Sequence, residues 1–290
     1  MQTILIQLDT DNQASIFDRV VAIDSGVAQI FSCAAVTPET VTSLVHGAIF
    51  TRGPADLKHT AIFIGGSSAA AGEALQKKVL KAFFGPLRVS VMMDSNGCNT
   101  TAAAAIATAR KHMPLTNVPA TVLGATGPVG LRAAELLAAE GAQVTLVSRT
   151  LDRAKAAAET IRERVPQAIV VAGAAADAQE NEALCRGAEV VVAAGAAGAC
   201  LLSQGALQRL SGLKLAIDLN AVPPLGLADV SANDKGVTHH GVLCYGALGV
   251  GGLKMKVHRQ CVASLFEASD RVLDTQAIYE VARRTAGITT

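Results

Sequence analysis

The chain has 290 residues, of which 50% are hydrophobic, and its 25 basic residues nearly balance 24 acidic ones to give a net charge of +1. This length suits a soluble protein of two domains, and the near-neutral charge argues against nucleic acid or an anionic membrane as the main partner. No apolar run reaches the roughly 18 residues that span a bilayer, and the N-terminus lacks the pattern of a signal peptide.

The first array of strands and helices covers residues 1–112 and predicts an α/β domain. Thr37 as N-cap and Pro38 at the first helical position predict the start of its second helix. Alternating strands and helices predict a mostly parallel sheet covered on both faces. The expected strands are 4–8, 28–36, 61–64 and 87–93, and the expected helices are 15–23, the segment from 37, 67–83 and 100–112.

A second array follows a proline-containing linker at 113–119. It predicts a doubly wound parallel Rossmann domain over 113–248, and the C-terminal helices of 249–290 are expected to pack back on the first domain. The expected strands are 121–123, 143–147, 168–171, 189–193 and 214–219, and the expected helices are 127–140, 151–165, 178–186, 253–269 and 274–285.

The most informative segment is 120–130, in which a strand runs into three glycines and then into a helix. Gly124 permits a backbone turn that a Cβ would resist, Gly127 lets the main chain approach a pyrophosphate, and Gly130 lets the helix lie close to its strand. The spacing is G-x-x-G-x-x-G rather than G-x-G-x-x-G, so the flanking strand and helix carry much of the prediction. The predicted phosphate site consists of Gly124, Thr126, Gly127, Pro128, Val129 and Gly130.

The second strand of this unit ends in Ser148, Arg149 and Thr150. A site for NAD usually has an acidic residue here, which binds the ribose hydroxyls. Two hydroxyls and a guanidinium instead suit a 2′-phosphate. We therefore expect NADP as the cofactor and NAD as a weaker one; the plain alternative for Arg149 is a solvated surface arginine.

Three further peptides rich in glycine or proline follow strands of the second array or precede its last helices, at 194–198, 220–226 and 247–252. Ligands of open parallel sheets bind beyond the carboxyl ends of the strands, so we expect these peptides to line the cofactor cleft. Each is also compatible with an ordinary turn. The expected contacts are Ala194, Gly195, Ala196, Asn220 and Gly249.

A polar cluster stands between the fourth strand and the next helix of the first array. Capping of that helix explains one or two of its members, and substrate binding is the competing interpretation for the others. The cluster consists of Asp94, Asn96, Asn99, Thr100 and Thr101. Further along, Lys254 and His258 share a helix face, as substrate contacts or as a solvated basic edge.

The six cysteines are scattered and form no C-x-x-C pair, which argues against a zinc site and a disulfide framework. Free thiols are typical of a reducing cytoplasm. The neighbours His239 and His240 are expected in a loop, without a metal.

Motifs over nearly the whole chain resemble the NAD(P)-dependent methylene-tetrahydromethanopterin dehydrogenases. They are Gln-Leu-Asp-Thr-Asp at 7–11 with Phe17 and Asp18, the segment 94–104, Ala-Thr-Gly-Pro-Val-Gly at 125–130, and the segments 220–226 and 245–256. The NADP-linked branch is the closer match because of residues 148–150. The resemblance implies that residues 1–112 form an α/β substrate (pterin) domain beside the Rossmann domain, with a cleft between them. It also implies a cytoplasmic homo-oligomer, expected to be a trimer, and a role in one-carbon metabolism in a methylotroph or a relative.

The resemblance also implies hydride transfer from a methylene-pterin to NADP, which leaves a methenyl cation. No proton leaves the reacting carbon, so the reaction needs positioning more than a strong base. A carboxylate near the cation would stabilise it, and lysines would bind a pterin carbonyl or the acidic tail of the substrate. The predicted catalytic residues are Asp18, Asp94 and Lys256, and the predicted substrate contacts are Asn96, Asn99, Thr100 and Lys254.

The related methylene-tetrahydrofolate dehydrogenase/cyclohydrolases carry a Tyr-x-x-x-Lys pair that this chain lacks, since Gly249 follows Tyr245 and Arg283 follows Tyr279 at that spacing. We therefore expect no cyclohydrolase activity. Two alternatives remain: a shikimate-dehydrogenase-like NADP reductase, which needs a Lys–Asp pair, and a non-catalytic NADP sensor, which has no use for the cluster at Asp94. The sequence leaves open the choice among tetrahydromethanopterin, its dephospho form and tetrahydrofolate.

Overall fold

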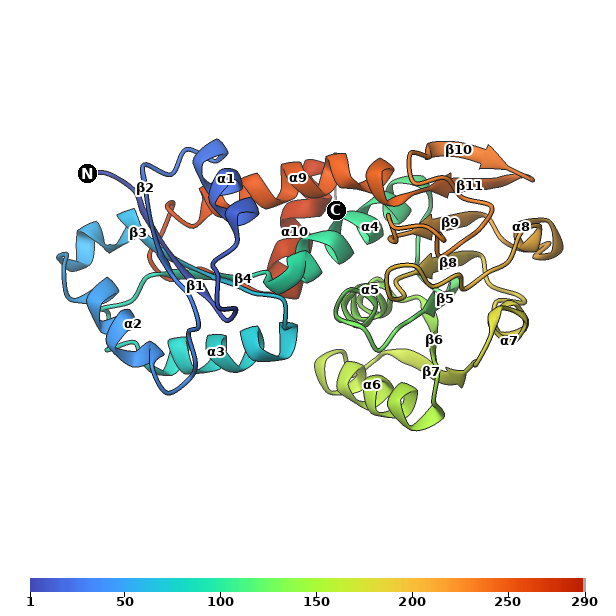
Figure 1. Ribbon diagram of the computed structural model, residues 1–290, viewed down its shortest axis with the longest axis horizontal. Helices are drawn as coiled ribbons and strands as arrows, with labels where there is room; N and C mark the ends of the chain where they lie inside the picture. The colour runs from blue at the N-terminus through green and yellow to red at the C-terminus, as the bar shows by residue number, and fades with distance from the viewer. Residues whose placement is uncertain (289–290) are drawn as a thin grey trace. The chain divides into compact units, whose positions relative to one another are not determined.

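The computed structural model describes residues 1–288, and the chain divides into two compact units, each of which is an α/β fold (Figure 1). Unit 1 comprises 1–100 and 255–281, and unit 2 comprises 101–254 with the residues that follow 281. Three helices, α4 (Cys98–His112), α9 (Ala247–Ser264) and α10 (Thr275–Thr285), begin in one unit and end in the other.

The sheet of unit 1 is entirely parallel, which confirms the expected α/β class. The direction of winding reverses between β1 and β3, and this reversal is the topological switch point where ligands of such sheets bind. In spatial order the strands are β12 (Val272–Leu273), β4 (Ser90–Met93), β3 (Thr60–Gly65), β1 (Ile4–Asp9) and β2 (Gln29–Cys33).

Helices cover both faces of this sheet, with α1 on one side and α2 and α3 on the other (Figure 1). Hydroxyl side chains cap two of them: Ser15 accepts from the N–H of Asp18, and Ser68 accepts from that of Ala71. The helical segments of unit 1 are α1 (Ile16–Asp24), α2 (Val41–Ile49), the 3-10 helix Pro54–His59, α3 (Ala69–Lys81) and the 3-10 helix Ser95–Gly97, and α10 (Thr275–Thr285) extends from it into unit 2.

The sheet of unit 2 has the doubly wound order expected of a Rossmann domain, and all its pairings are parallel except the hairpin of β10 and β11. Its switch point lies between β5 and β8. In spatial order the strands are β10 (Lys235–His239), β11 (Val242–Tyr245), β9 (Leu215–Asp218), β8 (Val190–Ala193), β5 (Pro119–Leu123), β6 (Gln143–Ser148) and β7 (Ile169–Ala174). The helices that lie wholly within this unit are α5 (Pro128–Ala139), α6 (Leu151–Arg164), α7 (Ala178–Leu184) and α8 (Ala206–Arg209).

Helix α2 begins at Val41, later than the predicted start at Pro38. The hydroxyl of Thr40 accepts from the N–H of Thr37 at 3.1 Å and donates to the carbonyl of Thr37 at 3.2 Å. These two bonds close a turn over 37–40, so the local side-chain bonding of threonine displaces the predicted capping by Thr37.

Helix α9 begins at Ala247, earlier than the predicted start at Leu253. The segment 247–252 is therefore helical, which excludes the alternative of an ordinary turn there. His239 ends strand β10 and His240 lies in the turn that follows it, so the expected loop holds only for His240.

Candidate functional site

The turn between β5 and α5 contains three glycines, and at two of them, Gly124 and Gly130, the packing leaves no room for a side chain. Gly124 has φ +71°, and a Cβ there would lie 2.7 Å from the Cα of Gly195. A Cβ on Gly130 would lie 2.5 Å from the carbonyl oxygen of Gly124. Packing of the turn against itself and against the peptide after β8 therefore requires both glycines.

Gly127 differs, because the packing of the protein does not require a glycine there. Its φ of −77° and ψ of 165° suit any residue. A Cβ would lie 3.4 Å from the carbonyl oxygen of Gly124 and 3.6 Å from that of Ala194, which is ordinary contact. The bare main chain at Gly127 thus leaves space that the protein itself does not fill.

The first turn of α5 is prepared for an anion. No side chain caps it, and it holds no acidic residue. By contrast Ser15, Ser68 and Asp177 cap α1, α3 and α7 with their side chains. Pro128 occupies the first helical position, where a missing N–H costs nothing. The unsatisfied N–H groups and the helix dipole together suit a phosphate.

The end of β6 carries the three residues that were predicted to bind a 2′-phosphate. Ser148 is buried, and its hydroxyl lies 3.1 Å from that of Thr126 in the glycine turn. Arg149 and Thr150 are exposed. Arg149 forms no hydrogen bond or ion pair with any residue that the structure describes, so its guanidinium is available to a ligand.

A buried carboxylate shapes the peptide after β9. Asp218 accepts from the N–H of Asn220 at 3.0 Å and from that of Leu227 at 2.9 Å, and burial raises the pKa of its carboxyl. The amide nitrogen of Asn220 donates to the carbonyl of Pro224 at 3.1 Å. Sequence reasoning found Asn220 but missed Asp218, whose signal is a lone acidic residue at the end of an apolar strand.

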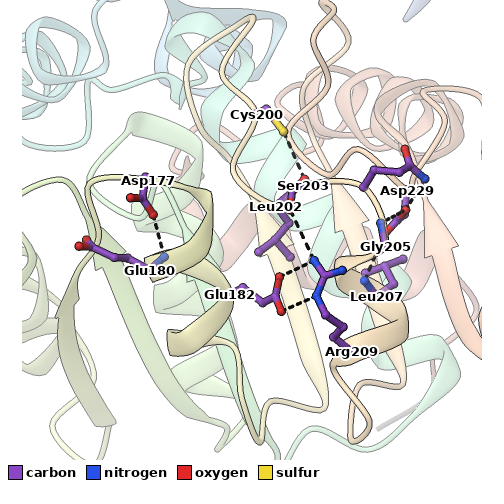
Figure 2. Close-up of polar contacts among 11 residues, drawn as sticks. Asp177, Glu180, Glu182, Cys200, Leu202, Ser203, Gly205, Leu207, Arg209 and Asp229 are labelled. Carbon is purple, nitrogen blue, oxygen red and sulfur yellow. Dashed lines mark hydrogen bonds and ion pairs between the residues drawn. The ribbon is translucent and has the colours of Figure 1, made fainter.

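The segment after β8 is fixed by polar contacts, which Figure 2 shows. Asp229 accepts from the N–H groups of Gly205 and Leu207 at 2.8 and 3.1 Å, at the start of α8. Arg209 of the same helix forms two bonds of 2.8 and 2.7 Å with Glu182. These contacts fix the position of α8. In the peptide 194–198, Ala194 and Gly195 are half-buried and Ala196 is exposed.

The glycine at 249 has a structural explanation within unit 2. It lies in α9, where a Cβ would be 1.9 Å from the carbonyl oxygen of Asp234. Close packing of this helix on the main chain therefore excludes any side chain at Gly249.

In unit 1, Asp94 of the predicted polar cluster caps the start of α4, and the side chain of Thr100 bonds to it. Asp94 is buried and accepts from the N–H groups of Asn99 and Thr100 at 2.8 and 3.0 Å, and from the hydroxyl of Thr100 at 2.6 Å. The amide nitrogen of Asn99 donates to the carbonyl of Met93 at 2.6 Å. Within this cluster only Asn96 is exposed, with a φ of 55°.

Two carboxylates converge at the switch point between β1 and β3. A Cβ on Gly65, the last residue of β3, would lie 3.1 Å from Oδ2 of Asp9 and 3.3 Å from Oδ2 of Asp18. Asp9 is buried and accepts from the N–H of Ser15 at 2.9 Å, whereas Asp18 is half-buried. Sequence reasoning singled out Asp18 but assigned no role to Asp9.

The basic residues of α9 have different surroundings. Lys256 is exposed and forms no hydrogen bond or ion pair with the residues that the structure describes, and Lys254 is half-buried. His258 is buried, so the expectation of a solvated basic edge was wrong for it.

All six cysteines are thiols without a disulfide bond. Among residues 1–288 no cluster of His, Cys, Asp or Glu could hold a metal ion, and no helix is long and apolar enough to cross a membrane.

Comparison with known proteins gives matches for both units. The family model for the N-terminal part of methylene-tetrahydromethanopterin dehydrogenase matches residues 16–96, and an NAD(P)H-binding family model matches residues 124–218. The bifunctional protein MdtA of Methylorubrum extorquens is 47% identical over 98% of this chain and 99% of its own. The NAD(P)-dependent methylenetetrahydromethanopterin dehydrogenase of the same organism is 33% identical over 99% of both chains.

Among solved structures, shikimate 5-dehydrogenase from Listeria monocytogenes aligns with a TM-score of 0.54 over 97% of this chain and 96% of its own. Its sequence identity of 11% shows a shared fold and nothing about activity.

Proposed function

This chain belongs to the methylene-tetrahydromethanopterin dehydrogenase family, and on that premise we propose that it transfers hydride from methylene-tetrahydromethanopterin to NADP and releases the methenyl form. The nicotinamide supplies the hydride acceptor when it is bound. The protein has to hold the donor carbon against the nicotinamide and to stabilise the cation that forms, and no proton transfer is needed at that carbon.

The uncapped first turn of α5 beside the bare main chain of Gly127 is the observation that carries the cofactor assignment. The glycine spacing and the match of residues 124–218 to an NAD(P)H-binding family support it. In this proposal the N–H groups of Val129 and Gly130 bind the pyrophosphate, and the peptides at Gly195 and Asn220 line the nicotinamide end.

The proposed site of the 2′-phosphate is the end of β6. Arg149 and Thr150 are exposed there, and the bond between Thr126 and Ser148 fixes that end relative to the phosphate turn. An exposed guanidinium without a protein partner, and the absence of an acid at 148–150, favour NADP over NAD.

The proposed substrate site lies in unit 1, at the switch point between β1 and β3. Asp18, which lies against Gly65, is the carboxylate that we propose to stabilise the methenyl cation. Lys256 of unit 1, and Lys254 in the part of α9 that belongs to unit 2, remain the proposed contacts of the pterin carbonyl or the acidic tail. Asn96 is the exposed polar contact. For Asp94, Asn99 and Thr100 the hydrogen bonds favour a supporting role, in which they hold the strand end and α4.

The finer expectations extend the same proposal. We infer a homo-oligomer, expected to be a trimer, and a place in cytoplasmic one-carbon metabolism of a methylotroph or a relative. Six thiols without a disulfide support a reducing compartment. Methylene-tetrahydrofolate is a second proposed substrate.

Steady-state kinetics with methylene-tetrahydromethanopterin and methylene-tetrahydrofolate, each with NADP and NAD, test the proposal through absorbance of the reduced nicotinamide. We expect the highest kcat/KM with methylene-tetrahydromethanopterin and NADP. Turnover of shikimate alone would point to the alternative reductase, and NADP binding without turnover of any of these donors would point to a sensor.

A further inference from the structure

In unit 1 the rings of Phe63, His258 and Phe17 form a chain of contacts from the core to the surface, in which the first pair is stacked and the ring of Phe17 is tilted by 41° against the imidazole. Phe63, in the middle of β3, is buried, and its ring lies nearly parallel to the imidazole of His258 with 5.7 Å between centroids and 19° between planes. The ring of Phe17 lies 6.2 Å from the same imidazole. His258 is 1% exposed, whereas Phe17 is 51% exposed. The outermost ring thus contacts a buried ring, and about half of the Phe17 residue is exposed to solvent.

Phe17, the outermost of the three rings, lies near the switch point of the sheet. Phe17 is the second residue of α1, which follows β1, and its neighbour Asp18 places a carboxylate oxygen 3.3 Å from where a Cβ of Gly65 would be. Gly65 is the last residue of β3. The exposed ring therefore lies at the carboxyl ends of β1 and β3, where open parallel sheets bind their ligands.

We propose that the exposed face of Phe17 is the stacking platform for the flat heteroaromatic ring of the substrate, with Asp18 beside it at the edge of that ring. This inference rests on the proposed function and adds the residue that recognises the ring. Aromatic residues make up only 3% of the chain, and none is tryptophan, so few other side chains offer a planar surface. An aromatic ring gains from stacking on a second ring beyond the apolar area that is buried.

The first experiment uses the absence of tryptophan. The variant Phe17→Trp carries the only indole of the protein, and we expect its fluorescence to be strongly quenched by tetrahydromethanopterin and by folic acid, because a stacked heteroaromatic ring quenches indole emission. The matched control is Phe84→Trp, at another exposed phenylalanine of unit 1, beyond the end of α3. Equal, weak quenching of the two variants would overturn the proposal.

The second experiment separates stacking from simple apolar contact. Phe17→Ala should raise the KM for methylene-tetrahydromethanopterin about tenfold or more, the effect expected for loss of one stacked ring. Phe17→Leu, which keeps apolar area without a π face, should give a smaller rise of about threefold. The Kd for NADP and the thermal unfolding midpoint should stay at the wild-type values. An unchanged KM in Phe17→Ala would contradict the proposal.

A competing explanation for the exposed ring is burial against a second copy of the chain. Ile16, Val20 and Ile23 of α1 are also exposed and would lie in the same contact. Sedimentation velocity of Phe17→Ala distinguishes the two: an unchanged oligomeric state supports the stacking role, and dissociation overturns it. If the wild-type enzyme turns over no methylene-pterin, the proposed function fails; if it does so while Phe17→Trp shows no specific quenching, only this inference fails.

Discussion

The hydroxyl oxygens of Thr126 and Ser148 lie 3.1 Å apart and join the glycine turn after β5 to the end of β6. One bond thus links the two places at which the phosphates of a dinucleotide are proposed to bind. Arg149 follows Ser148 directly, so the position of its main chain is set by this contact.

Replacing Arg149 by glutamine should weaken NADP specifically. Loss of a charge-assisted contact to the 2′-phosphate is expected to lower kcat/KM with NADP by about 10- to 100-fold, since charged hydrogen bonds contribute about 1.5–3 kcal/mol, while kcat/KM with NAD stays unchanged. Arg153→Gln is the matched control, because Arg153 is exposed in the first turn of α6 and loses the same charge. An undiminished preference for NADP in the Arg149 variant would refute the assignment.

Gly127→Ala should fold normally and bind the cofactor poorly. A Cβ there meets the protein only at ordinary contact distances, so we expect a thermal unfolding midpoint at or above that of the wild type and a much higher Kd for both NADP and NAD by calorimetry. Gly47→Ala in α2, where a Cβ would meet nothing within 4 Å, controls for the general effect of replacing a glycine by alanine. Wild-type affinity in Gly127→Ala would remove the pyrophosphate from this turn.

Gly130→Ala provides the opposite case. Its Cβ would clash with the main chain of Gly124 and Ala125 at 2.5 and 2.9 Å, so we expect a loss of about 1–3 kcal/mol in the free energy of unfolding. Denaturant titration measures it. Comparison of this variant with Gly127→Ala separates the glycine that packing requires from the one that the ligand requires.

Asp94→Ala should lower the free energy of unfolding more clearly than it lowers kcat. The substitution removes the acceptor of three hydrogen bonds at the buried start of α4, and loss of such a cap costs about 1–2 kcal/mol or more. Thr100→Val, which removes one of the three bonds, should cost less. If Asp94→Ala kept wild-type stability while kcat collapsed, Asp94 would be catalytic after all.

Thiol reactivity should divide the cysteines into two classes. Cys200 is exposed and Cys33 is half-buried, whereas the other four are buried. Burial raises the pKa of Cys185 to about 12 and that of Cys244 to about 11, which suppresses the reactive thiolates. In the native protein a thiol reagent should label at most Cys200 and Cys33, and in denaturant all six. Cys200→Ser should lower the native count by one.

His112 should make the protein less stable in mild acid. Its Nε2 lies 2.7 Å from the hydroxyl oxygen of Tyr245. Partial burial of the ring is the larger cause that lowers its pKa below 6.5, and repulsion from Lys111 is the smaller one. Below pH 6.5 the unfolded chain binds a proton more readily than the folded one, so the free energy of unfolding falls as pH drops through this range. Denaturant titrations from pH 7.5 to 5 should show a weaker pH dependence for His112→Gln. Equal slopes for variant and wild type would contradict this assignment.

The fold followed from the sequence because its strands are short apolar runs punctuated by glycine, and because helices alternate with them. The start of α2 did not follow, since Pro38 and Thr37 are compatible with either a helix start or the turn that Thr40 closes. The start of α9 was missed because Gly249 reads as a turn residue, whereas its close contact with Asp234 involves a residue well before it in the chain. The hairpin of β10 and β11 lacks an apolar pattern in its exposed first strand.

The glycine turn of the candidate cofactor site could be predicted because its geometry depends on the main chain. The spacing of Gly124 and Gly130 marks a turn whatever side chains surround it. The sequence could not separate the capping and binding roles of Asp94, because both place an acid before a helix. The sequence also contains no signal for the contacts among the three rings, since Phe17, Phe63 and His258 meet only in the folded unit.

The edge strand β12 pairs with β4 at Val272 and Val91, and the N–H of Val91 donates to the carbonyl of Arg271 at 2.8 Å. All the strands of unit 2, from β5 to β11, lie between these two partners in the sequence. During synthesis, strands β5 to β11 of unit 2 therefore leave the ribosome before the last strand of unit 1 exists. Unit 1 must wait for the end of translation to close its sheet, although its first residues are made earliest.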